Sequence, residues 1–171
     1  MIVVLSDTHA RERPGLSGRL AEGVRAAEQV IHCGDFVTAA VLDKFQSVSR
    51  SFLGVHGNAD APPVVDRLPA ATTFEAGGLR FAVTHRQRGG ETGLRFFGRE
   101  RGADVVVFGH THRPHVDRSG TPILLNPGSH AEPRGGEPTH LELTARDGGV
   151  SVEVVTGKGA VRTGFDLEGR R

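Results

Sequence analysis

Two closely spaced histidines follow a run of apolar residues near the middle of the chain. Three valines and Phe108 lead into Gly109, and His110 and His112 come next with one residue between them. An unbroken apolar run is typical of a strand buried on both faces, and we expect the glycine to let the chain turn sharply where this strand ends. In an extended His-x-His segment both rings leave the same side. Two imidazoles at the end of a rigid strand suit metal ligation.

Four other predicted strands also end in side chains that can bind a metal. The side chains that follow these strands are Asp7 with His9, then Asp35, Asn58 and His85. Each has an ordinary structural explanation, because Asp and Asn form turns and a single His often serves as a hydrogen-bond partner. Open α/β sheets, however, bind ligands at the carboxyl ends of their strands. The combination therefore predicts one shared site.

Seven nitrogen and oxygen ligands suit two transition-metal ions better than one. We assign Asp7, His9, Asp35 and His112 to the first ion, and Asp35, Asn58, His85 and His110 to the second. Asp35 is the natural bridge, because a carboxylate has two oxygens with spare lone pairs. Two ions about 3.5–4 Å apart can share a hydroxide nucleophile and clamp an anionic phosphate ester. Without thiolate ligands we expect two divalent transition-metal ions, and Mn, Fe, Zn, Co and Ni all fit this ligand set better than Ca.

The elements that must position these ligands alternate between strand and helix in the first part of the chain. Predicted helices cover residues 15–28, 38–46 with Thr38 as the cap, and 91–101. Predicted strands cover 2–5, 29–33, 51–55, 104–108 and a hairpin of 72–75 with 79–83 around Gly77-Gly78, followed by 115–117, 123–125, 140–144 and 150–155. Pro62-Pro63 is expected to break the chain, and residues 126–129 to form a turn. This order predicts an α/β core with added antiparallel strands, often arranged as two packed sheets.

The composition is that of one soluble domain. The 171 residues suffice for a single core, so we predict one domain over residues 1–171, in which 157–171 form either a loose tail or an edge strand. Such an edge could pair in a homo-oligomer. The net charge of +1 gives no strong signal for nucleic acid or membrane. Cys33 is the only cysteine, which excludes an internal disulfide. With no signal sequence or membrane-length apolar run, we expect a cytoplasmic protein.

The ordered set of motifs resembles the calcineurin-like metallophosphoesterases, and above all their small single-domain phosphodiesterase branch. The matching motifs are Asp7-x-His9, Gly34-Asp35, Gly57-Asn58-x-Asp60, His85, Gly109-His110-x-His112 and Asn126-Pro127-Gly128-Ser129. The resemblance implies an αββα sandwich of two mixed β-sheets flanked by helices. It also implies a dinuclear site that hydrolyses small phosphate esters, most directly phosphodiesters, by a metal-bridging hydroxide.

Two departures from the family pattern affect the expected chemistry. Ala59 stands where many members have a histidine that protonates the leaving group, and Arg86-Gln87 replaces the end of a His-Gly-His motif. An alanine cannot transfer a proton, so we expect aryl or activated esters to be cleaved better than alkyl esters. His130 either supplies the missing proton or is an ordinary surface histidine.

The remaining candidates lie around the metal ligands. Asp60 either orients a ligand from behind or forms a turn, and we place it with Asp35 and Asn58 in the catalytic group. Arg86 and Arg88 either contact the substrate phosphate through bidentate hydrogen bonds or stay solvated. The other histidines, His32, His56, His115 and His140, are expected to be structural.

Two alternatives remain open from the sequence. The first is a non-catalytic scaffold of the same fold, as in a branch that serves membrane-trafficking complexes with a degenerate metal site. Ala59 and Gln87 keep this alternative open, whereas the intact ligand set opposes it. The second is a phosphomonoesterase or a dinucleoside-polyphosphate hydrolase, which differs only in its substrate.

Overall fold

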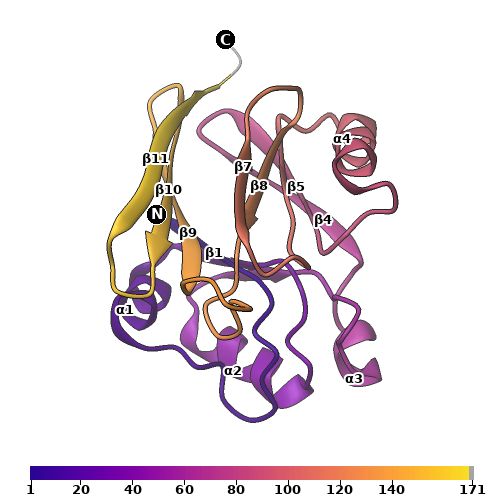
Figure 1. Ribbon diagram of the computed structural model, residues 1–171, viewed down its shortest axis with the longest axis vertical. Coiled ribbons are helices and arrows are strands. Elements are labelled where there is room, and N and C mark those ends of the chain that lie inside the picture. Colours follow the sequence, from indigo (N-terminus) through magenta and orange to yellow (C-terminus); the bar gives the residue numbers. More distant parts are fainter. Residues whose placement is uncertain (170–171) are drawn as a thin grey trace.

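Two mixed β-sheets pack face to face in the computed structural model, which describes residues 1–169 (Figure 1). The six-stranded sheet, in the order β11-β10-β9-β1-β2-β3, consists of β1 (Ile2–Leu5), β2 (Gln29–His32), β3 (Phe52–Gly54), β9 (Thr139–Arg146), β10 (Gly149–Thr156) and β11 (Val161–Glu168). The five-stranded sheet, in the order β4-β5-β6-β8-β7, consists of β4 (Ala71–Ala76), β5 (Leu79–Thr84), β6 (Val105–Val107), β7 (Pro114–Asp117) and β8 (Ile123–Pro127). The predicted sandwich of two mixed sheets flanked by helices is confirmed.

Each sheet has a parallel centre and antiparallel strands beside it. Strands β1, β2 and β3 run parallel, as do β5, β6 and β8. Strand β9 pairs antiparallel with β1, while β4 and β7 form antiparallel edges of the other sheet. The carboxyl ends of parallel neighbours lie at one edge of a sheet, which is where open sheets place their ligand-binding loops.

Alternation along the buried strands separates two kinds of core. Ile2 and Val4 of β1 face the layer between the sheets, whereas Val3 and Leu5 face the helices outside. In the same way β6 directs Val105 and Val107 between the sheets and the residue between them outward. Successive side chains of a strand point to opposite faces, so a strand covered on both sides must be apolar throughout. Burial of both faces of these strands therefore explains the unbroken apolar runs in the sequence.

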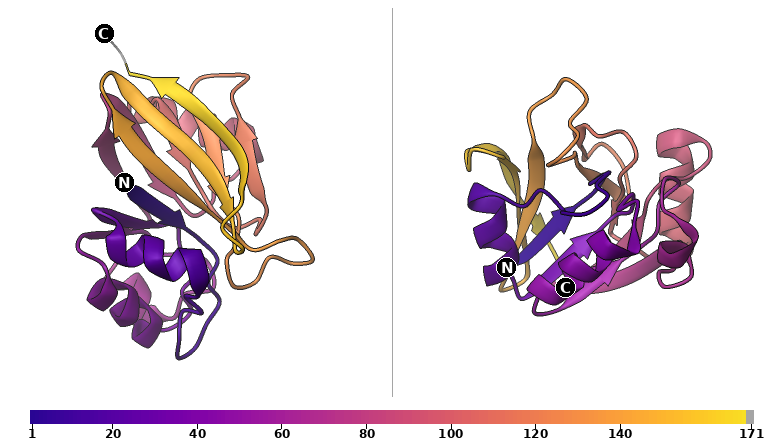
Figure 2. Two further views of the ribbon diagram at one scale, coloured as in Figure 1. Left: turned by 90° about the vertical axis from the view of Figure 1, so that its left-hand side faces the viewer. Right: turned by 90° about the horizontal axis from the view of Figure 1, so that it is seen from below.

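Helices α1 (Gly18–Ala26) and α2 (Ala39–Val48) cover the outer face of the six-stranded sheet. Helix α4 (Gly90–Glu100) covers the five-stranded sheet through Leu94 and Phe97. Seen from below, α1 and α4 lie on opposite sides of the pair of sheets (Figure 2). Thr38 caps α2 as predicted, because its hydroxyl accepts a hydrogen bond from the Val41 N–H. None of the helices in the described part of the chain combines the length and apolar character that a membrane span requires.

Several predicted boundaries need correction. The first helix begins at Gly18 rather than residue 15, because Gly15 and Gly18 both have left-handed backbones, with φ of 66° and 51°. Pro62-Pro63 does not simply break the chain but starts the short helix α3 (Pro62–Val65), since proline fits the first helical positions. The predicted turn at 126–129 is wrong in its first half, because β8 continues through Pro127 while paired with β7.

The hairpin and the tail settle two further expectations. Strands β4 and β5 form the predicted hairpin, in which Gly77 and Gly78 have positive φ of 55° and 76°. The tail contributes β11, an edge strand paired antiparallel with β10, rather than a loose segment. The last residues of the predicted tail, 170 and 171, lie outside the described part of the chain.

A buried ion cluster joins α1 to the six-stranded sheet. The carboxylate of Glu142, on β9, accepts hydrogen bonds from Arg19 Nε at 2.9 Å and Nη2 at 2.6 Å, and from His140 Nε2 at 3.2 Å. Only 3% of Glu142 is exposed. The hydrogen bond from His140, together with Arg19, outweighs burial and lowers the pKa of Glu142 to about 2.

Replacing this carboxylate should cost stability in a pH-dependent way. We expect Glu142→Gln to lower the free energy of unfolding by roughly 1–3 kcal/mol at pH 7. The native pKa lies below the ordinary value, so the ion cluster stabilises the fold above about pH 4.5 and loses its effect as the pH falls toward about 2. The difference between wild type and variant, measured by urea denaturation, should therefore shrink between pH 7 and pH 3. Glu75→Gln, an exposed strand glutamate, is the control; an equal loss at both pH values would contradict the charge effect.

Candidate metal centre

Left-handed backbone conformations concentrate at the predicted metal ligands. Five of them have positive φ: Asp7 at 55°, His9 at 45°, Asp35 at 63°, His110 at 74° and His112 at 61°. Among the described non-glycine residues only Val37 and Arg134 share this feature. Such a conformation costs about 1–2 kcal/mol for a residue with a Cβ atom and is held only where the surroundings impose it. The chain therefore turns at the ligands themselves.

This finding corrects the expectations for Gly109 and the His-x-His segment. Gly109 does not adopt a left-handed turn; it is required because a Cβ atom there would overlap Ser6 Oγ and lie 2.9 Å from Asp7 Oδ2. The segment is not extended, so the two rings do not share one side. His112 Nε2 lies 3.4 Å from Asp7 Oδ1, whereas the His110 ring packs edge-on against His85 with centroids 5.3 Å apart.

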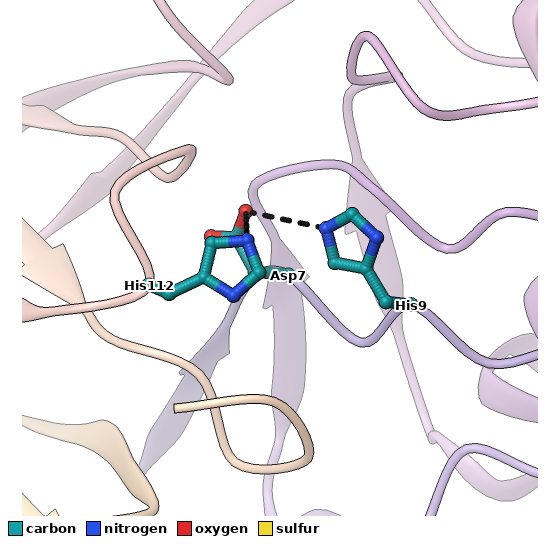
Figure 3. A group of neighbouring side chains, drawn as sticks. All are labelled: Asp7, His9 and His112. Carbon is teal, nitrogen blue, oxygen red and sulfur yellow. Dashed lines mark ion pairs between the residues drawn. The ribbon is translucent and has the colours of Figure 1, made fainter. Parts of the chain in front are cut away.

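The first group of converging side chains consists of Asp7, His9 and His112 (Figure 3). The Nε2 atoms of His9 and His112 lie 3.9 Å and 3.4 Å from Asp7 Oδ1, and the two rings stack with centroids 4.8 Å apart. One candidate ligand atom from each residue lies within 4.8 Å of the others. Asp7 follows β1 and His112 follows β6, so this group joins the two sheets.

The second group consists of Asp7, Asp35 and His85, and Asp35 connects it to the first. Asp35 Oδ2 lies 3.2 Å from His9 Nε2 and equally 3.2 Å from His85 Nε2. Asn58 Oδ1 lies 3.2 Å from the same His85 nitrogen. Asp35 thus occupies the position between the two groups that the sequence suggested for a bridging ligand, and Asp7 is also common to both.

Hydrogen bonds made by the Nδ1 atoms orient the imidazoles so that their Nε2 atoms face the carboxylates. His85 Nδ1 donates to the Cys33 carbonyl at 2.8 Å, and His112 Nδ1 donates to the Glu132 carbonyl at 2.6 Å. A carbonyl only accepts, so the Nδ1 atoms carry hydrogen and the Nε2 atoms are left to bind a ligand. His9 Nε2 is buried without a hydrogen-bond partner among the described residues. Imidazole lone pairs that face carboxylates across about 3 Å are what a divalent cation requires.

Electrostatics in the protein alone fit the same interpretation. Burial raises the pKa of Asp35, but the hydrogen bond and charge of His85 and the Ala59 backbone N–H outweigh it and lower this pKa to about 2. Burial lowers the pKa of His85, but Asp35 outweighs it and raises the pKa above its ordinary value. Burial also raises the pKa of Asp7. A proton on His85 thus balances Asp35 where a cation would otherwise do so, and metal binding should displace it.

Asp60 anchors the backbone behind the bridging carboxylate. Its side chain accepts hydrogen bonds from the backbone N–H groups of Asp35 at 3.1 Å, Val37 at 2.7 Å and Gly57 at 2.7 Å. On the neighbouring loop, the Ala59 N–H donates to Asp35 Oδ1 at 2.8 Å. The structure therefore places Asp60 behind Asp35 as a positioning residue for the loops after β2 and β3.

Three supporting residues were not assigned a role from the sequence. Ser129 Oγ donates to the Asp7 carbonyl at 2.7 Å, and Asn126 Nδ2 donates to the Gly109 carbonyl at 2.8 Å. Both belong to a segment that the sequence analysis listed as a turn and as a family motif, without a role for its side chains. Glu132 holds His112 through its carbonyl, a contact that no side-chain pattern reveals.

The weaker candidates lie at different distances from this cluster. Arg86 and Arg88 are exposed on the loop after β5, and Arg86 follows His85 directly. His130 is half-buried rather than on the surface; its Nε2 donates to the Pro14 carbonyl at 2.8 Å and burial lowers its pKa to about 4. In the described part of the chain no hydrogen bond or ring contact joins His130 to a predicted ligand.

The expected structural role of His32 agrees with its contacts. The ring is fully buried and stacks on Phe36, with centroids 3.8 Å apart. Its Nδ1 accepts a hydrogen bond from the Gly34 N–H at 3.2 Å, so Nε2 carries the hydrogen that is shared with Thr8 Oγ1 at 2.8 Å. His32 thus ties together the loops that carry His9 and Asp35.

Comparison with known proteins agrees with the geometry. Residues 1–148 match the calcineurin-like phosphoesterase superfamily domain. A probable metallophosphoesterase of Methanocaldococcus jannaschii is 32% identical over 86% of this chain and 77% of its own length. The phosphodiesterase YfcE of Escherichia coli is 29% identical over 66% of this chain and 62% of its own length. A single-mutant Vps29 from Entamoeba histolytica superposes with a TM-score of 0.82 at 18% identity, covering 98% and 99% of the two chains, a likeness of fold.

Metal binding should stabilise the native protein through Asp35. With Mn²⁺ at about one hundred times its dissociation constant, we expect a gain of about 2.7 kcal/mol in the free energy of unfolding. Asp35→Asn should remove most of this gain, since the amide loses the shared anionic oxygen. Thermal denaturation against Mn²⁺ concentration checks the gain, and calorimetric titration counts the ions. Asp147→Asn, an exposed hairpin residue, is the control; unchanged binding of both ions by Asp35→Asn would contradict the assignment.

Proposed function

The chain belongs to the calcineurin-like phosphoesterase superfamily, and we propose that it is a dinuclear metal-dependent phosphodiesterase that hydrolyses small phosphate esters. The observation that carries this proposal is the position of Asp35 Oδ2, at 3.2 Å from an imidazole nitrogen of each of two ligand groups. Two relatives, of Escherichia coli and Methanocaldococcus jannaschii, are named phosphodiesterases, which supports diesters as the substrates.

The converging side chains support a proposal of two ion sites. Asp7, His9, Asp35 and His112 would hold the first ion, and Asp35, Asn58, His85 and His110 the second, with Mn²⁺ as the first choice. When bound, the two ions supply Lewis acidity that makes water a nucleophile near neutral pH and offsets the charge of the phosphate.

The protein's own groups prepare this site for an anion. Asp35 is ionised near neutral pH because its pKa is about 2, and the Nδ1 hydrogen bonds hold His85 and His112 in one orientation. Asn58 and His110 are exposed at the mouth of the site, and Arg86 lines a recess with each of them. Among the described residues no acidic side chain forms an ion pair with Arg86. The exposed side chain of Arg86 is therefore free to bind a phosphate oxygen.

The residue after Asn58 limits what the site can do for the departing alcohol. Ala59 is half-buried, and only its backbone N–H contacts the site, through Asp35 Oδ1. His130 forms its hydrogen bond to Pro14 instead of reaching the ligands. Without a proton donor, esters whose alcohol leaves easily as an anion are the preferred substrates.

A scaffold function is the second candidate, and the likeness to Vps29 over nearly the whole chain favours it. Against it stands the ligand set, in which buried imidazoles and carboxylates face one another at close range. A protein that served only as a scaffold would have no need to keep five strained ligand residues in place. Activity measurements decide between the two candidates.

Hydrolysis of an aryl diester tests the enzymatic proposal. With added Mn²⁺ we expect turnover of bis(4-nitrophenyl) phosphate, and we expect Asp35→Asn to lower kcat/KM by roughly 10²–10³-fold because the shared ligand is lost. Asp147→Asn should retain wild-type kcat/KM. Release of 4-nitrophenolate is the readout, and 4-nitrophenyl phosphate reports monoesterase activity in parallel. Turnover that persists in Asp35→Asn, or the absence of turnover with every transition metal tested, would reject the proposal.

Introducing a proton donor should broaden the substrates. We expect Ala59→His to raise kcat for a diester with an alkyl leaving group by about tenfold or more, because general acid catalysis assists poor leaving groups. The rate with bis(4-nitrophenyl) phosphate should change by less than about twofold. Ala59→Gln, which is polar but does not titrate, is the matched control. Equal effects of the two variants on both esters would show that size, rather than proton transfer, governs this position.

A further inference from the structure

A recess of about 420 Å³ opens beside the candidate metal centre, and we propose that it binds the organic group of the phosphate ester. Its lining includes Arg86, Leu94, Phe108, His110, Arg113 and Pro114, and we call it the His110 recess. The occupant it fits is a flat apolar group, such as an aryl ring, that carries a second anionic substituent. This inference rests on the proposed function, because the ester phosphate must sit at the metal centre.

The His110 recess is continuous with the candidate ligands. Gly109 and His110 line it, and the same two residues contact the metal centre. The His110 N–H donates to both carboxylate oxygens of Asp7, at 3.1 Å and 2.9 Å, and the His110 ring packs on His85. The recess therefore adjoins the candidate metal centre through His110, so the organic group of an ester held there can reach the recess.

The floor of the recess is apolar. Leu94 comes from α4, Phe108 from the end of β6 and Pro114 from the start of β7. Leu94 and Phe108 are 4% and 6% exposed, so they offer a firm surface rather than mobile side chains. The Phe108 ring also contacts His115 edge-on, with centroids 6.2 Å apart. A planar apolar group can lie on such a floor, whereas a small hydrated alcohol gains little from it.

The rim of the recess carries more positive than negative charge, because its lining includes two arginines and one glutamate. Arg86 and Arg113 are exposed, and neither guanidinium has a hydrogen bond or ion pair within the described chain. The acidic residue of the lining, Glu91, lies 3.3 Å from His115 Nε2 and forms no ion pair with either arginine among the described residues. A guanidinium matches carboxylate and phosphate oxygens through parallel hydrogen bonds. The recess therefore favours an occupant with an anionic substituent beyond the ester phosphate.

A smaller recess on the other side of Arg86 explains why a diester suits this surface. It has a volume of about 240 Å³ and is lined by polar residues that include His56, Asn58, Thr84 and Gln87. Two recesses of different size thus adjoin the metal centre, the larger with an apolar floor and a cationic rim and the smaller with polar side chains such as Asn58 and Gln87 in its lining. A phosphodiester has two substituents to place, whereas a monoester has one.

Binding of three phosphonates to the Mn²⁺-loaded protein tests the inference. Phosphonates are not hydrolysed, and each has a single organic group for the recess. We expect phenylphosphonate to bind about tenfold more tightly than methylphosphonate because of the apolar floor. We expect 4-carboxyphenylphosphonate to bind about tenfold more tightly again because Arg113 contacts the carboxylate, while Arg86 contacts the phosphonate. Isothermal calorimetry gives the dissociation constants, and inhibition of aryl diester hydrolysis gives a second measure.

Variants separate the two parts of the recess. Arg113→Gln should remove the advantage of 4-carboxyphenylphosphonate over phenylphosphonate and leave the preference for phenyl over methyl unchanged. Arg113 is exposed, so this variant should fold normally. Arg50→Gln removes an exposed arginine outside the lining and should change neither ratio.

Equal binding of the three phosphonates, or a carboxylate advantage that survives Arg113→Gln, would overturn the inference. The result is distinguishable from failure of the proposed function, because calorimetry ranks the phosphonates even if no ester is hydrolysed. If the three phosphonates bind in the expected order but no ester is hydrolysed, the recess is supported and the phosphodiesterase proposal is rejected. If aryl diesters are hydrolysed but the three phosphonates bind equally, the phosphodiesterase proposal is supported and the recess is rejected.

Discussion

A single carboxylate, that of Asp35, lies between imidazoles that reach it from two ligand groups, and much of the surrounding structure keeps it there. Its backbone is held from behind by Asp60 and its second oxygen by the Ala59 N–H. Among the described residues no backbone N–H donates to Oδ2, the oxygen that faces His9 and His85. Carboxylate oxygens and imidazole lone pairs lie this close together only where a cation, either a proton or a metal ion, compensates their negative charge.

The strain of the site and the packing of the sandwich depend on each other. Left-handed turns at Asp7 and His112 are unfavourable alone, and they persist because rigid strands on either side leave no alternative path. Asp7 follows a strand of one sheet and His112 a strand of the other, so the distance between them depends on how the two sheets pack. Ser129 and Glu132 complete the arrangement by fixing the backbone of one and the ring of the other. The left-handed conformations in the loops destabilise the fold, and the packing of the buried layer between the sheets offsets this cost.

Substrate preference, in this view, comes from surfaces next to the ligands rather than from the ligands. Ala59 offers no proton, so the alcohol must leave without help, and aryl groups do so most readily. The apolar floor beside His110 fits the same class of group. Two independent features, one chemical and one steric, therefore point toward the same substrates.

The sequence by itself determined the architecture and the identity of the candidate ligands, because apolar runs of strand length and polar side chains directly after them are local patterns. It misplaced what depends on backbone conformation: Gly109 was expected to make a turn that His110 and His112 make instead, and the two rings were expected on one side. Only the tertiary structure decided that Asp60 is an anchor, that His130 binds Pro14, and that Arg113 joins Leu94 around one recess. Such relations join residues that are distant in the chain, and their distances are set by how the two sheets pack.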